Sequence, residues 1–329
     1  MKIKSIEDIA KLAGVSKTAV SAVINGKADK YRISKKTQEH IKEIIEKYDY
    51  TPNQVARSLR TQKTHTIGLI VPDLTNVFFA KVTRSLETAA REHSYQVLIA
   101  DSNENLADEK RAISNLASRS IDGLIIATVM VAEELEELEK LKIPTVFIDR
   151  EVESDSFSWV TSKNLENMEK LMRTLTDQGV NEVAYIGRRP ETSTSTKRYQ
   201  GYLNILEEAG IKKNDDIIQI GDDTREWAYQ AMKNIYEKNG RLPEALCSSA
   251  YLLTEGILRF LIDEFGEIPS DMKIATFDNV PELDYLHVKI QSVQQDWEGI
   301  ATTAYELLRN AMDKKPTEHR FIDATLIKR

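Results

Sequence analysis

The stretch IAKLAGVSKTAVSAVIN, residues 9–25, contains two short helical segments that a glycine separates. Ser5, with Asp8 three positions later, is typical of a capping box, so the first helix is expected to begin there. Gly14 ends that helix, and Ser16 can cap a second one. Two short helices joined by a tight glycine-containing turn predict a helix-turn-helix unit, whose second helix enters the major groove of DNA.

The second of these helices has an inner and an outer face, and Val20 and Val23 share the inner one. Outward positions near its start can reach base edges, where Lys17 can donate to guanine and Thr18 can touch a thymine methyl. The expected base-reading residues are Ser16, Lys17, Thr18, Ser21 and Ala22. Ala22 has no donor, so it either packs on a thymine methyl or reads nothing. A helix with a purely structural role is the alternative.

The amino-acid sequence of this segment resembles that of a known family of regulators. Residues 9–16, followed by residues 20–25, are similar to the N-terminal signature of the lac-repressor family. The resemblance covers essentially the whole chain, and the loop of residues 26–34 is closest to the fructose-repressor and sucrose-operon-repressor branch. It implies a sequence-specific DNA-binding transcriptional repressor of sugar utilisation genes.

Basic residues cluster in and after this loop. Cations at such positions contact phosphates and orient a DNA-binding unit without reading bases. The five expected phosphate contacts are Lys27, Lys30, Arg32, Lys35 and Lys36. A solvated basic loop is the alternative. Ser34 is expected to cap a third helix, whose stripe of Ile41 and Ile44 belongs to the core of the head.

A short segment after the head is a candidate switch. Pro52 favours a helix start, but a helix of about seven residues is marginal alone in water. In the family, this hinge helix pairs with that of a second subunit in the minor groove, where a leucine wedges into the central base step. The resemblance assigns the hinge contacts to Asn53, Val55, Ala56 and Leu59, with Leu59 as the wedge. The alternative is that Leu59 packs onto the body.

Net charge divides the chain into two parts. The 329 residues carry a formal charge of −7, yet residues 1–63 hold 14 basic and 7 acidic side chains, and the remainder holds 31 basic and 45 acidic ones. A basic head on an acidic body indicates that only the head meets a polyanion. The single cysteine, Cys247, excludes an internal disulfide framework. With no signal peptide and no apolar run of about 18 residues, the expectation is a cytoplasmic protein without a membrane partner.

From residue 64 the pattern changes to short apolar strands that alternate with amphipathic helices, which predicts parallel sheets covered on both faces. The expected strands are 66–71, 96–100, 123–128, 144–148, 183–187, 244–247, 273–277 and 291–293. With the resemblance, the expected fold is α/β. It comprises an all-α helix-turn-helix head (1–50), a hinge helix and linker (51–63), and a two-lobed periplasmic-binding-protein-like body (64–329) with two doubly wound parallel sheets. The expected lobes are 64–161 with 294–318, and 162–293 with 319–329.

Open parallel sheets bind ligands beyond the carboxyl ends of their strands. Carboxylates, amides, arginines and two aromatics follow the expected strands, and sugars are held by such groups. The resemblance carries the family's effector contacts onto Phe78, Phe79, Asp149, Arg150, Arg198 and Asp278, and the strand-end pattern adds Asp73 and Gln295. Helix capping is the favoured alternative for Asp101, Ser102 and Ser248. Asp223 stands where the family often has an aromatic platform, and Trp227 is expected to pack.

In that branch of the family the effector is fructose or fructose 1-phosphate. Arg150, Arg198 and the pair Arg188-Arg189 can hold a phosphate, or they can hold hydroxyls or pair with Asp149 and Asp278. The expected partners are therefore a palindromic operator DNA, a second copy of the chain and a small sugar that releases the dimer from DNA. The alternatives are a different sugar, a purine that acts as corepressor, or a sugar-binding protein without a DNA role.

Two further alternatives concern the body. The helix of residues 79–92, with Val82, Leu86 and Ala89, is either a dimer surface or the inner face of a helix that covers a sheet. An enzyme is an alternative, in which Asp149, Asp278, Glu255 and His287 would act as catalytic acids and bases. However, the sequence has no glycine-rich phosphate loop, serine nucleophile elbow or cluster of metal ligands, so no catalysis, cofactor or metal is expected.

Overall fold

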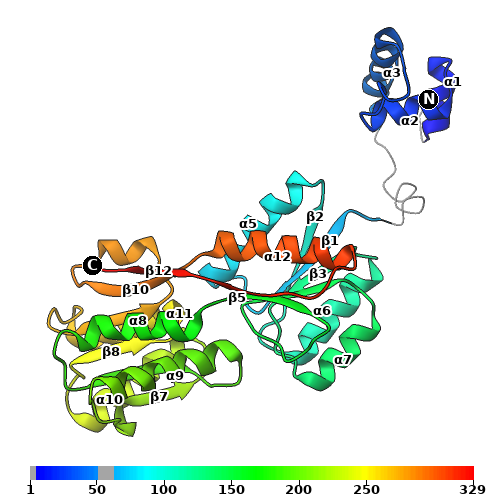
Figure 1. The fold of residues 1–329 in the computed structure, drawn as a ribbon. Helices are drawn as coiled ribbons and strands as arrows, with labels where there is room; N and C mark the ends of the chain where they lie inside the picture. Colours follow the sequence, from blue (N-terminus) through cyan, green and yellow to red (C-terminus); the bar gives the residue numbers. More distant parts are fainter. Residues whose placement is uncertain (1–4, 51–62) are drawn as a thin grey trace. The chain divides into compact units, whose positions relative to one another are not determined.

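The computed structural model describes residues 5–50 and 63–329, and the chain forms two compact units (Figure 1). One unit ends at Thr64 and the other begins at His65. The expected hinge residues lie outside the described residues, namely Asn53, Val55, Ala56 and Leu59.

In the described part of the first unit, the helices are α1 (Ile6–Ala13), α2 (Lys17–Ile24) and α3 (Lys35–Lys47). The predicted capping box is present at the start of α1. Ser5 Oγ accepts a hydrogen bond from Asp8 N at 3.2 Å, and Ser5 N donates to Asp8 Oδ2 at 3.1 Å. The box satisfies two backbone donors that would otherwise lack partners, so it fixes where the helix begins.

A small apolar core holds the head together. Ile9, Val20 and Ile41, one from each helix, are fully buried where the three helices meet. Burial of a side chain of this size contributes roughly 1.5–3 kcal/mol. Gly14 ends α1 at a φ of 64°, a left-handed conformation that glycine adopts without a steric penalty. The predicted helix-turn-helix is confirmed, and the α3 stripe belongs to its core.

The described part of the second unit contains two six-stranded sheets. The first sheet has the order β11-β5-β4-β3-β1-β2, and all its neighbouring strands run parallel. Its strands are β1 (Thr66–Val71), β2 (Gln96–Asp101), β3 (Gly123–Ile126), β4 (Thr145–Ile148), β5 (Ser158–Ser162) and β11 (His319–Ile322).

The second sheet has the order β12-β10-β9-β8-β6-β7. Its strands run parallel except for the edge strand β12, which is antiparallel to β10. They are β6 (Val183–Arg188), β7 (Ile218–Gly221), β8 (Ala245–Ser248), β9 (Lys273–Phe277), β10 (Ile290–Gln295) and β12 (Ala324–Ile327). The predicted α/β architecture of two doubly wound sheets is confirmed.

Helices cover both faces of each sheet, which explains why the central strands are continuous apolar runs (Figure 1). On the first sheet, one face packs against α5 (Val77–Glu92) and α12 (Trp297–Met312), and the other against α6 (Leu106–Ser118) and α7 (Ala132–Lys140). On the second sheet, one face packs against α8 (Asn164–Thr176) and α9 (Ser193–Glu208), and the other against α10 (Arg225–Asn239) and α11 (Tyr251–Phe265). Short 3₁₀ helices occupy Asp215–Ile217 and Pro281–Tyr285.

Each of the eight expected strands is present, and its ends differ from the expectation by two residues at most. The sequence pattern missed β5, β7, β11 and β12. These strands are short, and several of their residues are polar or half-exposed. Their pairing partners, rather than a local apolar run, hold them in the sheets.

The chain passes between the two lobes at Lys163, at Asp296 and at Asp323. The prediction that residues 319–322 belong to the second lobe is wrong, because β11 pairs with β5 of the first sheet. Trp159 of β5 stacks on His319 at 4.6 Å between ring centroids, which helps to hold β11 there. Residues 294–295, expected in the first lobe, also belong to the second, because β10 continues to Gln295.

The apolar stripe of α5 faces the sheet. Val82 and Leu86 are buried in the first-lobe core, and Ala89 packs against it. Of the two alternatives for this stripe, the inner face of a sheet-covering helix is therefore the correct one for these residues. Cys247 is likewise fully buried, in β8, and burial raises the pKa of its thiol. Within residues 5–50 and 63–329, helices that combine the length and the apolar character needed to cross a membrane do not occur.

A close approach of α10 and α11 gives a test of this packing. A Cβ atom at Gly256 would lie 2.1 Å from the carbonyl oxygen of Arg225, so Gly256→Ala must push the helices apart. We expect this variant to lose about 1–3 kcal/mol of unfolding free energy in urea denaturation. Glu264→Ala, at an exposed position of the same helix, is the matched control. Equal urea midpoints for the two variants would contradict the expectation.

Candidate nucleic-acid interface and interlobe cleft

The start of α2 presents polar side chains to solvent. Ser16, Lys17 and Thr18 are exposed, and Ser21 is half-buried. Ser16 Oγ caps the helix by accepting a hydrogen bond from Ala19 N at 3.2 Å. Four of the five expected base-reading residues therefore lie on an accessible face of the helix that would enter a groove.

Ala22 does not point outward, so the prediction for this residue is wrong. Its side chain is only 5% exposed. The loop after α2 folds back, with Lys27 N donating to the Ala22 carbonyl at 2.8 Å and Ala28 buried against the head core. Helical periodicity alone could not reveal a cover that comes from a neighbouring loop.

Lys17 already has an anionic partner on α1. Its Nζ lies 2.7 Å from Glu7 Oε2, and Lys11 Nζ lies 3.8 Å from the other oxygen of the same carboxylate. The hydrogen bond from Lys17 and the charges of both lysines lower the pKa of Glu7. Sequence reasoning did not single out Glu7, because the pairing depends on how α1 and α2 cross. The ammonium group of Lys17 has three N–H donors, so its contact with Glu7 leaves donors for a second acceptor.

All five expected phosphate-contacting cations are exposed, namely Lys27, Lys30, Arg32, Lys35 and Lys36. The loop that carries the first three is ordered by backbone contacts. Ile33 N donates to the Ala28 carbonyl at 3.0 Å, and Gln38 Nε2 donates to the Ile33 carbonyl at 2.8 Å. The cations therefore stand on a fixed scaffold rather than on a free chain.

The second unit has a cleft of about 690 Å³ between its lobes. All eight residues that the sequence assigned to the effector line it: Asp73, Phe78, Phe79, Asp149, Arg150, Arg198, Asp278 and Gln295. They come from the carboxyl ends of strands in both sheets, or from the first two turns of the helices that follow.

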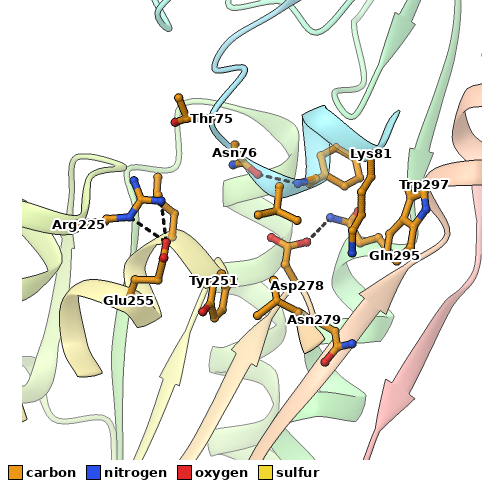
Figure 2. A pocket seen from close by; sticks show the side chains of 14 residues that line it. Thr75, Asn76, Lys81, Arg225, Tyr251, Glu255, Asp278, Asn279, Gln295 and Trp297 are labelled. Carbon is orange, nitrogen blue, oxygen red and sulfur yellow. Dashed lines mark hydrogen bonds and ion pairs between the residues drawn. The ribbon is translucent and has the colours of Figure 1, made fainter. Parts of the chain in front are cut away.

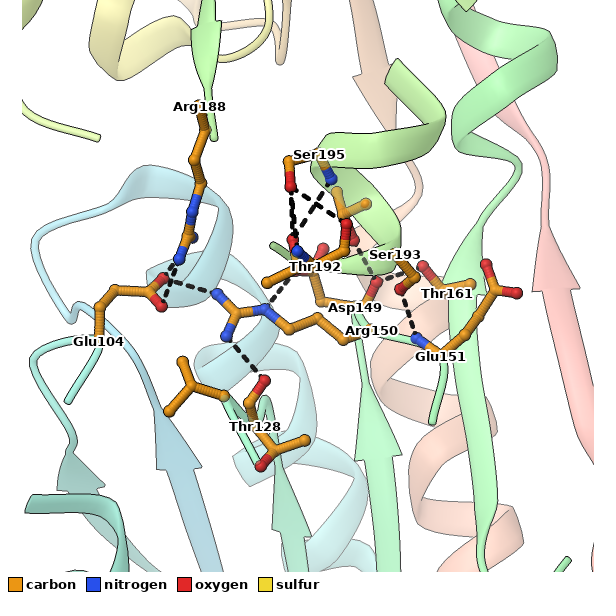
Figure 3. A network of polar contacts seen from close by, with 12 residues as sticks. Glu104, Thr128, Asp149, Arg150, Glu151, Thr161, Arg188, Thr192, Ser193 and Ser195 are labelled. Atoms are coloured by element: carbon orange, nitrogen blue, oxygen red, sulfur yellow. Dashed lines mark hydrogen bonds and ion pairs between the residues drawn. The ribbon is translucent and has the colours of Figure 1, made fainter. Parts of the chain in front are cut away.

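Two arginines in the cleft share one carboxylate (Figure 3). Arg188, at the end of β6, donates from both terminal nitrogens to the two Glu104 oxygens at 2.7 and 2.8 Å. Arg150 donates to Glu104 Oε1 at 2.6 Å and to the Thr128 carbonyl at 2.7 Å. Burial opposes ionisation of Glu104, but the hydrogen bond from Arg188 and the charges of both arginines outweigh it and lower its pKa to about 2.

The other two arginines considered for a phosphate are also engaged. Arg198 donates to Asn164 Oδ1 at 2.9 Å and to the Ser249 carbonyl at 2.8 Å, and its guanidinium lies 3.7 Å from the centre of the Phe277 ring. Arg189 pairs with Asp222 at 2.9 Å. Protein groups thus give each guanidinium a defined orientation.

Asp149 follows β4 in a left-handed conformation, with a φ of 67°. Its carbonyl accepts hydrogen bonds from Thr161 Oγ1 and, across the cleft, from Thr194 Oγ1 at 2.8 Å. Burial raises the pKa of its carboxyl group, although the charges of Arg150 and Arg198 oppose the shift. Burial also raises the pKa of Asp223, whose buried Oδ1 has no hydrogen-bond partner in the described residues. Both carboxyl groups are suited to accept hydrogen bonds from ligand hydroxyls.

A third set of contacts lies where the lobes meet, and Figure 2 shows its Gln295–Asp278 hydrogen bond. Gln295 Nε2 donates to Asp278 Oδ1 at 2.6 Å, and Gln295 Oε1 accepts from Ser162 Oγ at 2.6 Å. Ser162 ends β5 of the first sheet, whereas Gln295 ends β10 of the second. The amide of Gln295 therefore connects the two lobes directly beside the cleft.

The two aromatic residues of the cleft come from the first turn of α5, and Ala250 and Leu252 line it from the second lobe. Phe78 and Phe79 lie edge to face at 5.0 Å between ring centroids, and both also pack in the first-lobe core. Asp223 lines the cleft at the place where an aromatic platform was considered. Trp227 packs over Gly221 and against the second-lobe core, as expected.

Several residues that complete the site were not predicted, above all Glu104, Thr194 and Asn164. Glu104 follows β2 by three residues, so the strand-end rule could have included it, but its arginine partners are remote in the sequence. The four residues considered as catalytic acids and bases do not come together in one site. Glu255 pairs with Arg225 at 2.8 Å, and His287 Nε2 contacts the Ile268 carbonyl.

An exposed helix-turn-helix and a polar cleft between two lobes, carried by one chain, define the class of ligand-responsive DNA-binding regulators. Residues 5–53 match the family described as "Bacterial regulatory proteins, lacI family". Residues 64–316 match "Periplasmic binding proteins and sugar binding domain of LacI family". The chain therefore belongs to the lacI family, and it is a DNA-binding transcription regulator rather than an enzyme.

Named relatives lie in the branch that the sequence indicated. The fructose operon regulatory protein of Vibrio cholerae serotype O1 is 35% identical over 94% of this chain and 95% of its own length. The sucrose operon repressor of Klebsiella pneumoniae is 33% identical over 99% and 98%, respectively. Among solved structures, the Cra transcriptional dual regulator from Pseudomonas putida in complex with fructose 1-phosphate has a TM-score of 0.74 at 27% identity. That match covers 80% of this chain and 98% of the Pseudomonas chain.

The Glu104 ion pairs give a prediction about pH. Because the pKa of Glu104 falls from 4.5 to about 2 on folding, the pairs stabilise the protein above about pH 4.5 and lose this effect as the pH falls toward 2. We expect Glu104→Gln to unfold with about 1–3 kcal/mol less free energy than wild type at about pH 7, and the difference to shrink by about pH 3.5. Denaturant titrations at both pH values measure it. A difference that does not change with pH would contradict the assignment.

Proposed function

We propose that the protein is a homodimeric transcriptional repressor that acts in the cytoplasm on sucrose or fructose utilisation genes. The head (1–50) binds a palindromic operator, the hinge (51–63) joins two subunits on it, and the body (64–329) binds a small sugar that releases the dimer. The observation that carries the proposal is the cleft, where all eight expected effector residues converge in a chain that also bears an exposed recognition helix.

In this proposal α2 reads bases with Ser16, Lys17, Thr18 and Ser21, and Ala22 reads nothing because it is buried. The five exposed cations between Lys27 and Lys36 contact phosphates and set the register of the head on the duplex. The hinge contacts of Asn53, Val55, Ala56 and the Leu59 wedge rest on the sequence alone. Two wedges at the centre of the operator would kink the DNA.

The proposed effector is fructose or a close derivative. Carboxylates, amides and arginines face one another across the cleft, with Phe78 and Phe79 at its wall, and such groups suit the hydroxyls and the ring face of a sugar. The names of the Vibrio and Klebsiella relatives and the fructose 1-phosphate in the Pseudomonas structure support this class of ligand.

The proposed mechanism is a hinge motion. Ligand contacts both lobes, and the three chain crossings at Lys163, Asp296 and Asp323 allow one lobe to rotate against the other. That rotation would disturb the pairing of the hinge segments on DNA. A coupling of about 1–3 kcal/mol would change operator affinity by roughly 5–150-fold, and operator DNA would weaken sugar binding by the same factor.

The test is a titration of the purified protein against a fluorescent palindromic operator from its own promoter. It is repeated with fructose, fructose 1-phosphate, sucrose and fructose 6-phosphate, at two salt concentrations. Release by a fructose compound supports the proposal and names the inducer. Tight binding that no sugar alters removes the sugar assignment, tighter binding with a ligand reverses the sign to corepression, and the absence of any sequence preference refutes operator recognition.

Substitutions in the head distinguish base reading from phosphate contact. We expect Lys17→Ala to lose about 1–3 kcal/mol of operator affinity and much of the preference for operator over other DNA. Lys30→Ala should weaken binding to all sequences and reduce the salt slope of log K by about 1. Lys42→Ala on the exposed face of α3 removes the same charge away from both sets and is the control. If Lys17→Ala behaved like Lys42→Ala, α2 would not read the operator.

A further inference from the structure

The Arg150–Glu104–Arg188 triad spans the cleft (Figure 3). Glu104 and Arg150 follow strands of the first sheet, whereas Arg188 ends β6 of the second. The carboxylate takes the position between the two guanidinium groups that a bound anion would take. Glu104 thus supplies the negative charge that a phosphate group would otherwise bring to the two arginines.

The backbone holds Glu104 in this place. Asn103 and Glu104 both have left-handed conformations, with φ values of 49° and 53°. Asn103 N donates to Asp101 Oδ1 at 2.9 Å, and Asn105 N donates to the Ser102 carbonyl at 2.8 Å, directly before α6. A left-handed glutamate costs roughly 1–3 kcal/mol and persists only where its surroundings enforce it. The loop is therefore built to present this carboxylate.

Both terminal nitrogens of Arg188 donate to Glu104, and those of Arg150 donate to Glu104 and to the Thr128 carbonyl. Arg198, the remaining arginine that lines the cleft, is held by Asn164, Ser249 and the Phe277 ring. A phosphate group that entered the cleft would have to displace Glu104 before it could make with Arg188 the bidentate contact that this carboxylate now makes.

The charge of the cleft also disfavours a phosphate group. Three arginines face five carboxylates in its lining: Asp73, Glu104, Asp149, Asp223 and Asp278. Burial raises the pKa of Asp149 and Asp223. Even with both of these protonated, the remaining acids equal the arginines in number, so the cleft carries no net positive charge. A phosphate monoester brings about −1.5 to −2 at neutral pH, and the cleft as it stands does not attract it.

We propose that the effector of this cleft is an uncharged sugar, and that Glu104 sets this specificity by keeping Arg150 and Arg188 from a phosphate group. The proposal rests on the proposed function in that the ligand is taken to be a sugar. Replacing Glu104 by a neutral residue releases two arginines at one point, and the cleft should then accept the phosphate of fructose 1-phosphate. The Pseudomonas complex with fructose 1-phosphate makes a phosphorylated effector the opposing outcome.

A second ion pair between the lobes supplies a matched control. Glu151, also after β4, pairs with Lys197 of α9 at 2.5 Å, and the Glu151 backbone N–H donates to Ser193 Oγ at 2.8 Å. Neither Glu151 nor Lys197 lines the cleft. Glu151→Gln therefore removes a carboxylate that joins the lobes without exposing a cleft arginine. It separates an effect of charge in the site from an effect of lobe closure.

The experiment is calorimetric titration of the full-length wild type, Glu104→Gln, Glu104→Ala and Glu151→Gln with inorganic phosphate, fructose and fructose 1-phosphate. Two substitutions at Glu104 guard against a folding defect in one of them, and thermal unfolding checks that each variant is folded. We expect wild type and Glu151→Gln to prefer fructose. Both Glu104 variants should bind inorganic phosphate and fructose 1-phosphate at least about tenfold more tightly than wild type does.

The proposal is overturned if wild type binds fructose 1-phosphate more tightly than fructose, or if the Glu104 variants gain no more affinity for phosphate than Glu151→Gln does. Inorganic phosphate tests the arginines without any sugar. Failure of the proposed function can therefore be distinguished from failure of this inference. In that case the Glu104 variants gain phosphate binding, which supports exclusion of anions by Glu104, while neither sugar binds any of the proteins.

Discussion

The parallel direction of the strands in both sheets is the constraint on which the cleft depends. Parallel strands bring their carboxyl ends to one edge of a sheet, and three chain crossings connect the two edges. Residues as distant in sequence as Asp73 and Gln295 therefore meet without long loops. The helices that follow the strands begin at the same edge, so their cap residues Asn76 and Thr192 also line the cleft.

Much of the fold could be predicted because buried parallel strands are apolar along their whole length, as in β1 and β9. The strands that escaped prediction depend on partners far away in the sequence. Trp159 and His319 stack although they lie 160 positions apart in the sequence, and no local sequence pattern predicts that contact. The misplaced third crossing has the same cause, since the position of β11 is decided by pairing with β5.

The cleft residues could be predicted for a related reason, since a strand end is a local feature and the topology then brings such ends together. Glu104 was missed because its role depends on a left-handed loop and on Arg188 in the other lobe. Ala22 was misplaced because a helical wheel does not include the loop that covers it. Sequence reasoning thus predicted which side chains gather in the cleft, but not how their charges are divided among partners.

The late position of α12 and β11 in the chain has a consequence for folding during synthesis. Helix α12 packs over β3, β4 and β5 of the first sheet, yet it is made only after roughly 130 residues of the second lobe. At about 5–20 residues per second, part of the first lobe's apolar face stays uncovered on the ribosome for roughly 7–26 seconds. The head, complete by residue 50, can fold long before that. The uncovered apolar face makes the nascent body a substrate for chaperones. The first lobe is not an independent folding unit, because part of its core comes from α12.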